Sequence, residues 1–231
     1  MYLIVFPYFT LFYSIININF KIMDNTINYN WENDHEHTPK IEKGLSKILN
    51  NPDYKLLNHI DVGCGNGALT IKFYKYFKRT LGIDLSKKGI ELAKKYENEK
   101  IKFENESIEN LINNKKKFDF VTSVEVIEHQ YDPLDFIQKL NQITEKNGYV
   151  LITTPFHGYY KNLLISLLNL NDKHYIALWK HGHIKFFSIK TFKELLKMSG
   201  TNLEIKKINY CGRFYPFSHS MIFLLKKNEK V

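Results

Sequence analysis

A run of alternating glycines constrains the fold of this chain more than any other feature of its sequence. Gly63, Gly65 and Gly67 follow an apolar segment that includes Asp61, and a segment with helical spacing follows them. This pattern is typical of a buried strand that turns through a glycine loop into a helix, where a ligand can approach bare backbone. The run therefore predicts an α/β domain with a nucleotide-like ligand at this turn.

Strand-like and helix-like segments alternate along most of the chain. We expect strands at 56–62, 80–83, 101–104, 118–124, 149–153, 203–210 and 221–225, and helices at 40–50, 68–77, 86–96, 133–143 and 188–198. Three of these helices begin next to side chains suited to capping: Ser86, Asp132 and Ser188. The alternation predicts the α/β class, with a doubly wound, Rossmann-like seven-stranded sheet, mostly parallel with an antiparallel last strand, and helices on both faces.

One domain accounts for residues 23–231, with an insert at about 156–187 where the strand–helix pattern breaks. Residues 1–22 form an apolar N-terminal extension, and residues 1–20 contain no charged side chain. No basic cluster or small-residue cleavage site marks a secretory signal. Three interpretations stay open: a marginal membrane anchor, an element docked on the domain, or a non-native leader before a start at Met23.

Charge and cysteine content limit the compartment and the partners. The formal net charge is +9, but the lysines are scattered, which is more typical of solvated helix faces than of a nucleic-acid surface. Nucleic acid therefore stays a secondary candidate partner. The only cysteines, Cys64 and Cys211, are far apart, so a reducing compartment fits. We expect a cytoplasmic protein, with membrane association through residues 1–20 left open; the sequence does not predict the oligomeric state.

An acid directly before the glycine loop distinguishes this loop from a phosphate-binding one. Asp61 would repel a pyrophosphate and attract an amine, and the Gly-x-Gly-x-Gly spacing differs from the dinucleotide fingerprint. At these residues the chain resembles the class I S-adenosylmethionine-dependent methyltransferases, whose second acid matches Asp84 after the next strand. The resemblance implies a single methyltransferase domain at 23–231, with the insert on its substrate side.

The resemblance also implies roles for individual residues. Asp61 and the loop backbone would hold the methionine portion of the cofactor, and Asp84 the ribose hydroxyls. Leu85 would pack on adenine, Glu106 would accept from its amino group, and the Ser107 amide would face the ring. The Cys64 side chain receives no chemical role. The implied cofactor-binding set is Asp61, Gly63, Cys64, Gly65, Asn66, Gly67, Asp84, Leu85, Glu106, Ser107 and Val124.

Two carboxylates and an imidazole lie where the fourth strand ends. Glu125, Glu128 and His129 are the candidate catalytic residues, and a helical turn would point them to one side. Mixed oxygen and nitrogen ligands suit Mg²⁺, Mn²⁺, Fe²⁺ or Zn²⁺. A metal site, His129 acting alone as a general base, and a purely structural hydrogen-bonding role remain alternatives.

The same run resembles two methyltransferase groups: the ubiquinone-biosynthesis O-methyltransferases and the small-RNA 3′-end 2′-O-methyltransferases. The second group adds a distal histidine to its metal ligands, and His183 aligns with it, with His181 as second choice. The resemblance thus implies a metal set of Glu125, Glu128, His129 and His183. Tyr175 and Trp179 could line an acceptor pocket, and Tyr29 and Trp31 a lid over the cofactor.

The leading hypothesis is O-methylation of a small or lipid-like hydroxyl acceptor, quinone-precursor-like or glycan-like. A metal-assisted RNA 2′-O-methyltransferase is the first alternative. A non-catalytic binding module on the same fold is an alternative of another class, and a nicotinamide dehydrogenase is a distant fourth.

Overall fold

The computed structural model describes residues 38–175, 178 and 182–229. The predictions for residues 1–22, Tyr29, Trp31, Trp179 and His181 lie outside these ranges.

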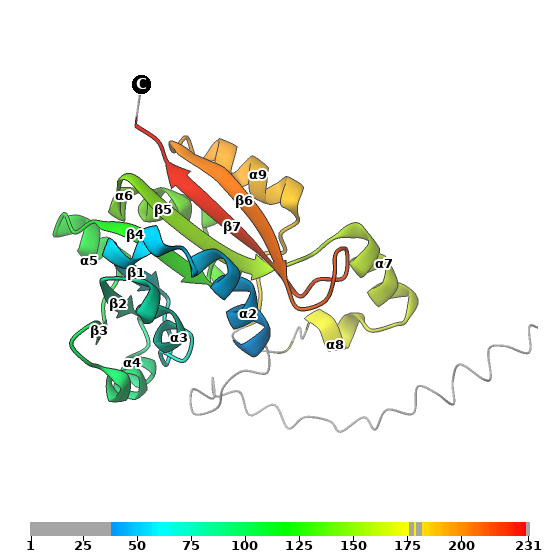
Figure 1. The fold of residues 1–231 in the computed structure, drawn as a ribbon. Helices are drawn as coiled ribbons and strands as arrows, with labels where there is room; N and C mark the ends of the chain where they lie inside the picture. The colour runs from blue at the N-terminus through cyan, green and yellow to red at the C-terminus, as the bar shows by residue number, and fades with distance from the viewer. Residues whose placement is uncertain (1–37, 176–177, 179–181, 230–231) are drawn as a thin grey trace, which may run out of the picture.

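Seven strands form one sheet in the order β3-β2-β1-β4-β5-β7-β6 (Figure 1). The strands are β1 (Asn58–Val62), β2 (Arg79–Ile83), β3 (Ile101–Glu104), β4 (Phe118–Val124), β5 (Thr144–Pro155), β6 (Leu203–Cys211) and β7 (Ser220–Lys227). The first five pair in parallel, and β7 runs antiparallel to both β5 and β6. The predicted fold class, including the antiparallel last strand, is confirmed.

Helices cover both faces of the sheet. They are α2 (Thr38–Leu49), α3 (Thr70–Phe73), α4 (Lys87–Ala93), α5 (Ile108–Asn113), α6 (Pro133–Ile143) and α9 (Ile189–Met198), joined by short 3₁₀ turns η1 (Pro52–Leu56), η2 (Tyr74–Tyr76), η3 (Lys94–Tyr96) and η4 (Ile127–His129). The predicted helix caps are confirmed, because the side chains of Ser86, Asp132 and Ser188 accept hydrogen bonds from backbone amides in the first turns of their helices. Helix α5 was not predicted: it is too short to show helical periodicity, although Ser107 caps it.

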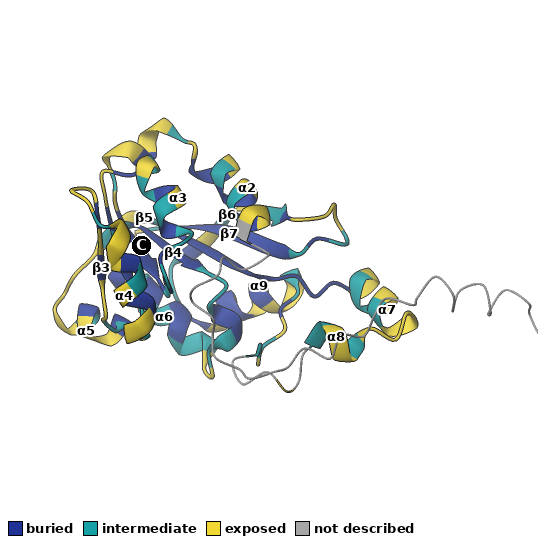
Figure 2. Ribbon diagram, turned by 90° about the horizontal axis from the view of Figure 1, so that it is seen from below, coloured by how far each residue is buried: buried dark blue, intermediate teal, exposed yellow. Residues whose placement is uncertain are grey.

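The core consists of two main layers on either side of the sheet. Helices α2 and α3 pack on one face, around buried residues such as Leu45 and Phe73. Helices α5, α6 and α9 pack on the other, around residues such as Leu140 and Phe192. Figure 2 shows the strands as the buried centre and the helices exposed on their outer sides. The strand ends at the rim of the sheet are therefore the places where functional side chains can be presented.

The segment after β5 lies apart from this core. Helices α7 (Tyr159–Leu167) and α8 (Asn171–Tyr175) extend beyond the end of the sheet, and neither contains a buried residue (Figure 1). Several large apolar side chains of α7 are exposed, among them Tyr159 and Leu167. Within the part of the chain that the structure describes, no helix is long and apolar enough to cross a membrane.

Candidate active site

The carboxyl ends of the parallel strands bring the predicted site residues to one edge of the sheet. The glycine loop follows β1, Asp84 follows β2, and Glu125 follows β4. Because β1 pairs with both β2 and β4, all three segments are neighbours. Val124, at the end of β4, is half-buried at the same edge.

The glycine loop packs tightly against the turn that follows β4. Gly63 adopts a left-handed backbone conformation with φ of +80°, which disfavours a side chain. A Cβ atom at this position would approach Val126 Cγ2 to 2.5 Å. The cofactor loop and the candidate catalytic turn are therefore in direct contact.

Four amides of the loop, those of Gly63, Cys64, Gly65 and Gly67, are already hydrogen-bonded within the protein. Gly63 and Cys64 both donate to Ile83 O, at 2.9 and 3.0 Å, and Gly67 donates to Cys64 O at 2.9 Å. Gly65 donates to Asp84 Oδ2 at 2.9 Å. A phosphate-binding loop points such amides at its ligand. In this loop these amides point at acceptors within the protein. The geometry of the loop therefore disfavours a bound phosphate, in agreement with the prediction from the Gly-x-Gly-x-Gly spacing and Asp61.

Asp61 lies beneath the loop as a buried carboxylate. Its side chain is 2% exposed and accepts the hydroxyls of Thr70, at 2.6 Å, and Thr122, at 2.7 Å. Burial raises the pKa of Asp61, and the two hydroxyl donors act in the opposite direction. Among the described residues, no cationic side chain forms an ion pair with it. The site therefore offers a negative charge that has no countercharge among the described residues.

Asp84 links the loop to the second strand. Its carboxylate accepts Ser86 N at 2.7 Å and Gly65 N at 2.9 Å. The next side chain, Leu85, is 78% exposed, so its face is open to a ring stacked on it. The Cys64 side chain instead points into a small apolar cluster with Phe103, and its neighbour Asn66 accepts Ala68 N in the loop.

Glu106 and Ser107 are hydrogen-bonded to each other after β3. The Ser107 amide donates to Glu106 Oε1 at 2.8 Å, and Asn110 Nδ2 donates to the same oxygen at 2.6 Å. These bonds, led by the one from Ser107, lower the pKa of Glu106. The Ser107 amide therefore faces the Glu106 carboxylate, while the Ser107 side chain caps α5.

Glu125 is held in an unusual conformation at the end of β4. Its φ is +53°, a left-handed value that is rare for residues other than glycine. Its carboxylate accepts the hydroxyls of Thr153, at 2.7 Å, and Ser220, at 3.2 Å. Burial raises the pKa of Glu125 to about 7, while these bonds and the nearby Lys161 charge act against the rise.

Three of the four predicted metal ligands come together. Each of Glu128, His129 and His183 offers one ligand atom, and these three atoms lie within 4.8 Å of one another. Glu128 is fully buried, and neither of its carboxylate oxygens has a well-formed hydrogen bond to a described residue. Burial, and then the Glu125 charge, raise its pKa well above the usual range. His129 Nδ1 lies 3.3 Å from Gly182 O and donates to it.

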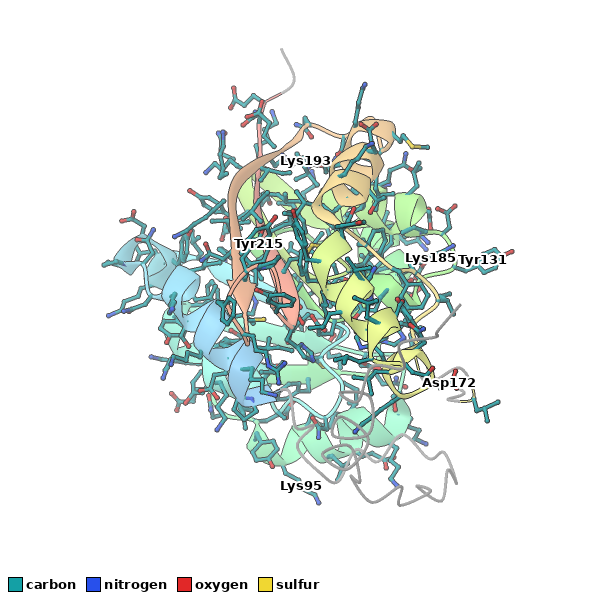
Figure 3. All side chains as sticks on the ribbon, turned by 90° about the vertical axis from the view of Figure 1, so that its right-hand side faces the viewer. Lys95, Tyr131, Asp172, Lys185, Lys193 and Tyr215 are labelled. Atoms are coloured by element: carbon teal, nitrogen blue, oxygen red, sulfur yellow. The ribbon has the colours of Figure 1, made fainter. Side chains whose placement is uncertain are left out.

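The segment that contains His183 is hydrogen-bonded to the backbone of Glu128. The amides of Ile184 and Lys185 both donate to Glu128 O at 3.0 Å. At the same place, Lys185 Nζ lies 5.7 Å from the centre of the Tyr131 ring, and both side chains reach the same edge of the molecule (Figure 3). The fourth predicted ligand, Glu125, lies outside this group, because hydroxyls of β5 and β7 hold its carboxylate. The structure thus groups three of the four predicted ligands.

A second group of polar side chains was not predicted from the sequence. His157, after β5, is 8% exposed, and neither ring nitrogen has a well-formed hydrogen bond to a described residue. Its ring lies 5.6 Å from His174 and 5.0 Å from Phe186. Lys161 Nζ donates to Phe156 O at 2.8 Å, and burial lowers the pKa of Lys161 to about 8. The sequence singled out this segment for its aromatic residues only, because no pattern reveals which of its polar side chains are buried.

Comparisons with known proteins agree with this geometry. The model of a family described as "Methyltransferase domain" matches residues 31–205, so the chain belongs to this methyltransferase family. A solved magnesium protoporphyrin IX methyltransferase from Synechocystis, with bound S-adenosylhomocysteine, superposes with a TM-score of 0.63 over 83% of this chain and 84% of its own. At 14% identity, this likeness shows the fold.

The curated relatives are more similar in sequence. The ubiquinone biosynthesis O-methyltransferase of Pelagibacter ubique is 32% identical over 161 residues, which are 67% of this chain and 65% of the relative. That of Rickettsia prowazekii is 30% identical over 198 residues, 82% of this chain and 72% of the relative. The chain thus spans about two thirds of the length of these relatives.

Proposed function

We propose that this protein is an S-adenosylmethionine-dependent O-methyltransferase that acts on a small or lipid-like hydroxyl acceptor. The observation that carries the proposal is the buried Asp61, which has no countercharge among the described residues. The ammonium group of the cofactor's methionine portion supplies one. The loop above Asp61 has its amides engaged, so it suits this cation and not a phosphate.

The other cofactor contacts follow from the same edge of the sheet. Asp84 would accept from the ribose hydroxyls, and the exposed Leu85 would pack on the adenine ring. The reaction transfers a methyl group from sulfur to the acceptor oxygen, and the acceptor hydroxyl loses its proton. The residues of this chain contribute by placing the two reactants in line.

Calorimetry with S-adenosylhomocysteine tests the cofactor assignment. We expect the unmodified protein to bind it, and Asp61→Ala and Asp84→Ala to weaken binding by about tenfold or more, because hydrogen bonds to charged groups contribute about 1.5–3 kcal/mol. Asp53→Ala, which removes an exposed acid from η1, is the matched control and should leave binding unchanged. Absence of binding by the unmodified protein would contradict the proposal.

Glu128, His129 and His183 fit a divalent metal ion. The set mixes one carboxylate with two imidazoles, and the buried Glu128 oxygens make no well-formed hydrogen bond to a described residue, which is rare for such groups. When bound, such an ion lowers the pKa of a coordinated hydroxyl and orients it. Glu125 would act beside this group, holding its position through Thr153 and Ser220.

Metal titration tests this set of ligands. Glu128→Gln and His183→Ala should each lower the affinity for Mn²⁺ or Zn²⁺ by about 10–100-fold. Glu125→Gln is the matched control: it neutralises a neighbouring carboxylate that the structure leaves outside the group, and it should retain the affinity. Equal losses in all three variants would restore the four-residue set and contradict the narrower one.

The acceptor would lie beside the insert. Both relatives are named for ubiquinone biosynthesis, which favours a ring hydroxyl on a quinone-precursor-like acceptor. His157, Lys161 and His174 supply hydrogen-bonding groups there, and Tyr175, stacked 6.0 Å from His157, supplies an aromatic wall. The exposed apolar face of α7 beside them would suit a lipid-like tail.

Transfer of labelled methyl groups distinguishes the acceptors. We expect label from S-adenosylmethionine to enter a lipid extract and not total RNA. His157→Asn should raise the KM for the acceptor and leave the binding of S-adenosylhomocysteine unchanged, since His157 lies on the acceptor side. Label found only in RNA would instead support the metal-assisted RNA 2′-O-methyltransferase.

A further inference from the structure

A line of hydrogen bonds crosses three strands beneath the cofactor loop. It begins at Thr80 on β2, whose hydroxyl lies 3.1 Å from His59 Nδ1 on β1. His59 Nε2 lies 2.9 Å from the hydroxyl of Thr122 on β4. Thr122 in turn donates to Asp61 Oδ1 at 2.7 Å. His59 is a buried titratable group that the proposed reaction does not use.

The donor in each of these bonds is fixed by the chemistry of its groups. The Thr122 hydroxyl carries one proton, and Asp61 Oδ1, at 2.7 Å, is a much closer acceptor for it than Ile60 O, at 3.4 Å; the ionised carboxylate can only accept. His59 Nε2 must therefore carry the proton that faces Thr122. Nδ1 of the neutral ring then holds a lone pair, and the Thr80 hydroxyl must donate to it. The protons thus all point toward Asp61, and reversing one bond would leave a lone pair facing a lone pair.

Burial makes this arrangement rigid. Thr80, His59, Thr122 and Asp61 are each at most 4% exposed, and the His59 ring stacks on Phe77 with centroids 4.0 Å apart. Burial also lowers the pKa of His59 to about 3, which keeps the ring neutral at physiological pH. On its other side, Asp61 Oδ2 accepts the Thr70 hydroxyl from α3, so both carboxylate oxygens are held.

We propose that His59 and Thr122 are positioning residues for the cofactor, which hold the Asp61 carboxylate in the orientation that receives the ammonium group of the methionine portion. This inference rests on the proposed function. A purely structural role for the same hydrogen bonds makes a different prediction. If the role were purely structural, substitutions at these residues would lower the stability of the protein. They would weaken the binding of ligands with and without the amino group equally.

Two ligands separate these roles. S-adenosylhomocysteine carries the amino-acid portion, and 5′-methylthioadenosine shares its thioadenosine portion without the amine. Thr122→Val keeps the shape of the side chain and removes the hydroxyl. We expect it to weaken S-adenosylhomocysteine binding by about tenfold, which corresponds to about 1.4 kcal/mol, and methylthioadenosine binding by less than about twofold. His59→Leu should act in the same direction, and Thr122→Ser should restore binding.

Ser123→Ala is the matched control, because Ser123 is an equally buried hydroxyl on the same strand with no hydrogen bond in the described structure. It should change neither affinity. Equal weakening of both ligands by Thr122→Val, or no weakening of S-adenosylhomocysteine, would overturn the positioning role. Failure of the unmodified protein to bind S-adenosylhomocysteine would overturn the proposed function, and this inference with it.

Nitrogen NMR of the His59 ring gives a second test that needs no variant of Thr122. The deduced donor order requires a neutral ring with its proton on Nε2 at pH 7. A ring protonated on Nδ1, singly or doubly, would contradict that order and remove the basis of the proposal.

Discussion

At the scale of single residues, this protein keeps several titratable groups in environments that disfavour their charge. His59 and His157 are both buried, and burial lowers the pKa of each to about 3. Asp61 and Glu128 are buried acids whose pKa is raised. Such groups reduce stability unless they are neutral or meet a partner. Their collection around the ends of β1, β4 and β5 is the residue-scale signature of a ligand site.

The contribution of His59 to the stability of the protein should fall on acidification, whereas the raised pKa values of Glu125 and Glu128 act in the opposite direction. The folded state keeps His59 neutral, whereas the unfolded chain binds a proton below the ordinary His pKa of 6.5. The unfolded state therefore gains protons first, and stability is lost as the pH falls from 6.5 toward 3. His59 should cost about 1.4 kcal/mol per pH unit in this window, or about 2 kcal/mol by pH 5. Urea unfolding of the unmodified protein and His59→Gln at pH 7 and pH 5 checks this; equal losses in both proteins would contradict it.

At the scale of elements, the loop between β1 and α3 carries the main geometric constraint. It must reverse direction within a few residues, donate its amides to β2 and Asp84, and pack against the turn after β4. Glycine meets these conditions because it tolerates positive φ and leaves room for close contacts. The strand on one side and the short helix on the other follow from ordinary apolar patterning.

Replacing Gly63 by alanine should therefore be costly. The variant combines an unfavourable φ of +80° with a Cβ placed 2.5 Å from Val126 Cγ2. We expect it to lower the free energy of unfolding by about 2–4 kcal/mol, from backbone strain plus overpacking. Gly200→Ala is the control, since its φ is +62° and nothing lies within 4 Å of the added atom. It should cost only about 1 kcal/mol. Similar losses in the two variants would show that the contact with Val126 does not matter.

At the scale of the whole molecule, the last strand completes the sheet. Strand β7 lies between β5 and β6 and pairs with both along its length. Its residues Met221 to Leu225 are buried. The match to the family model ends at residue 205, before this strand begins. The part of the chain that matches the family model is therefore smaller than the part that must be present for the core to close.

A chain that ends at Gly212 should fail to unfold cooperatively. It lacks β7 and so exposes the edge of β5 and the apolar face beneath it. A chain that ends at Asn228 keeps β7 and should unfold like the full chain. Circular dichroism during urea unfolding compares the two. A cooperative transition in the shorter chain would contradict the central role assigned to β7.

Local sequence patterns were enough to predict much of the fold of this protein. The order of strands and helices, the helix caps and the glycine loop were predictable, because neighbouring residues specify periodicity, capping and turns. The neighbourhood of Asp61, Asp84 and the Glu128–His129 pair followed, since parallel strands end at one edge. Helix α5 and the buried His157 were not predictable, because a six-residue helix lacks periodicity and a polar residue carries no local sign of burial.

Only the tertiary structure decided which side chains meet. The amides of Ile184 and Lys185, which follow His183, donate to Glu128 O and so place His183 beside Glu128. The Glu125 carboxylate accepts the hydroxyl of Ser220, 95 residues away. The tertiary structure also joined His59 to Thr122, 63 residues apart, and so to Asp61. Hydrogen bonds form only between atoms about 3 Å apart. Such distances between remote residues depend on the packing of the complete sheet, and no local pattern in the sequence encodes them.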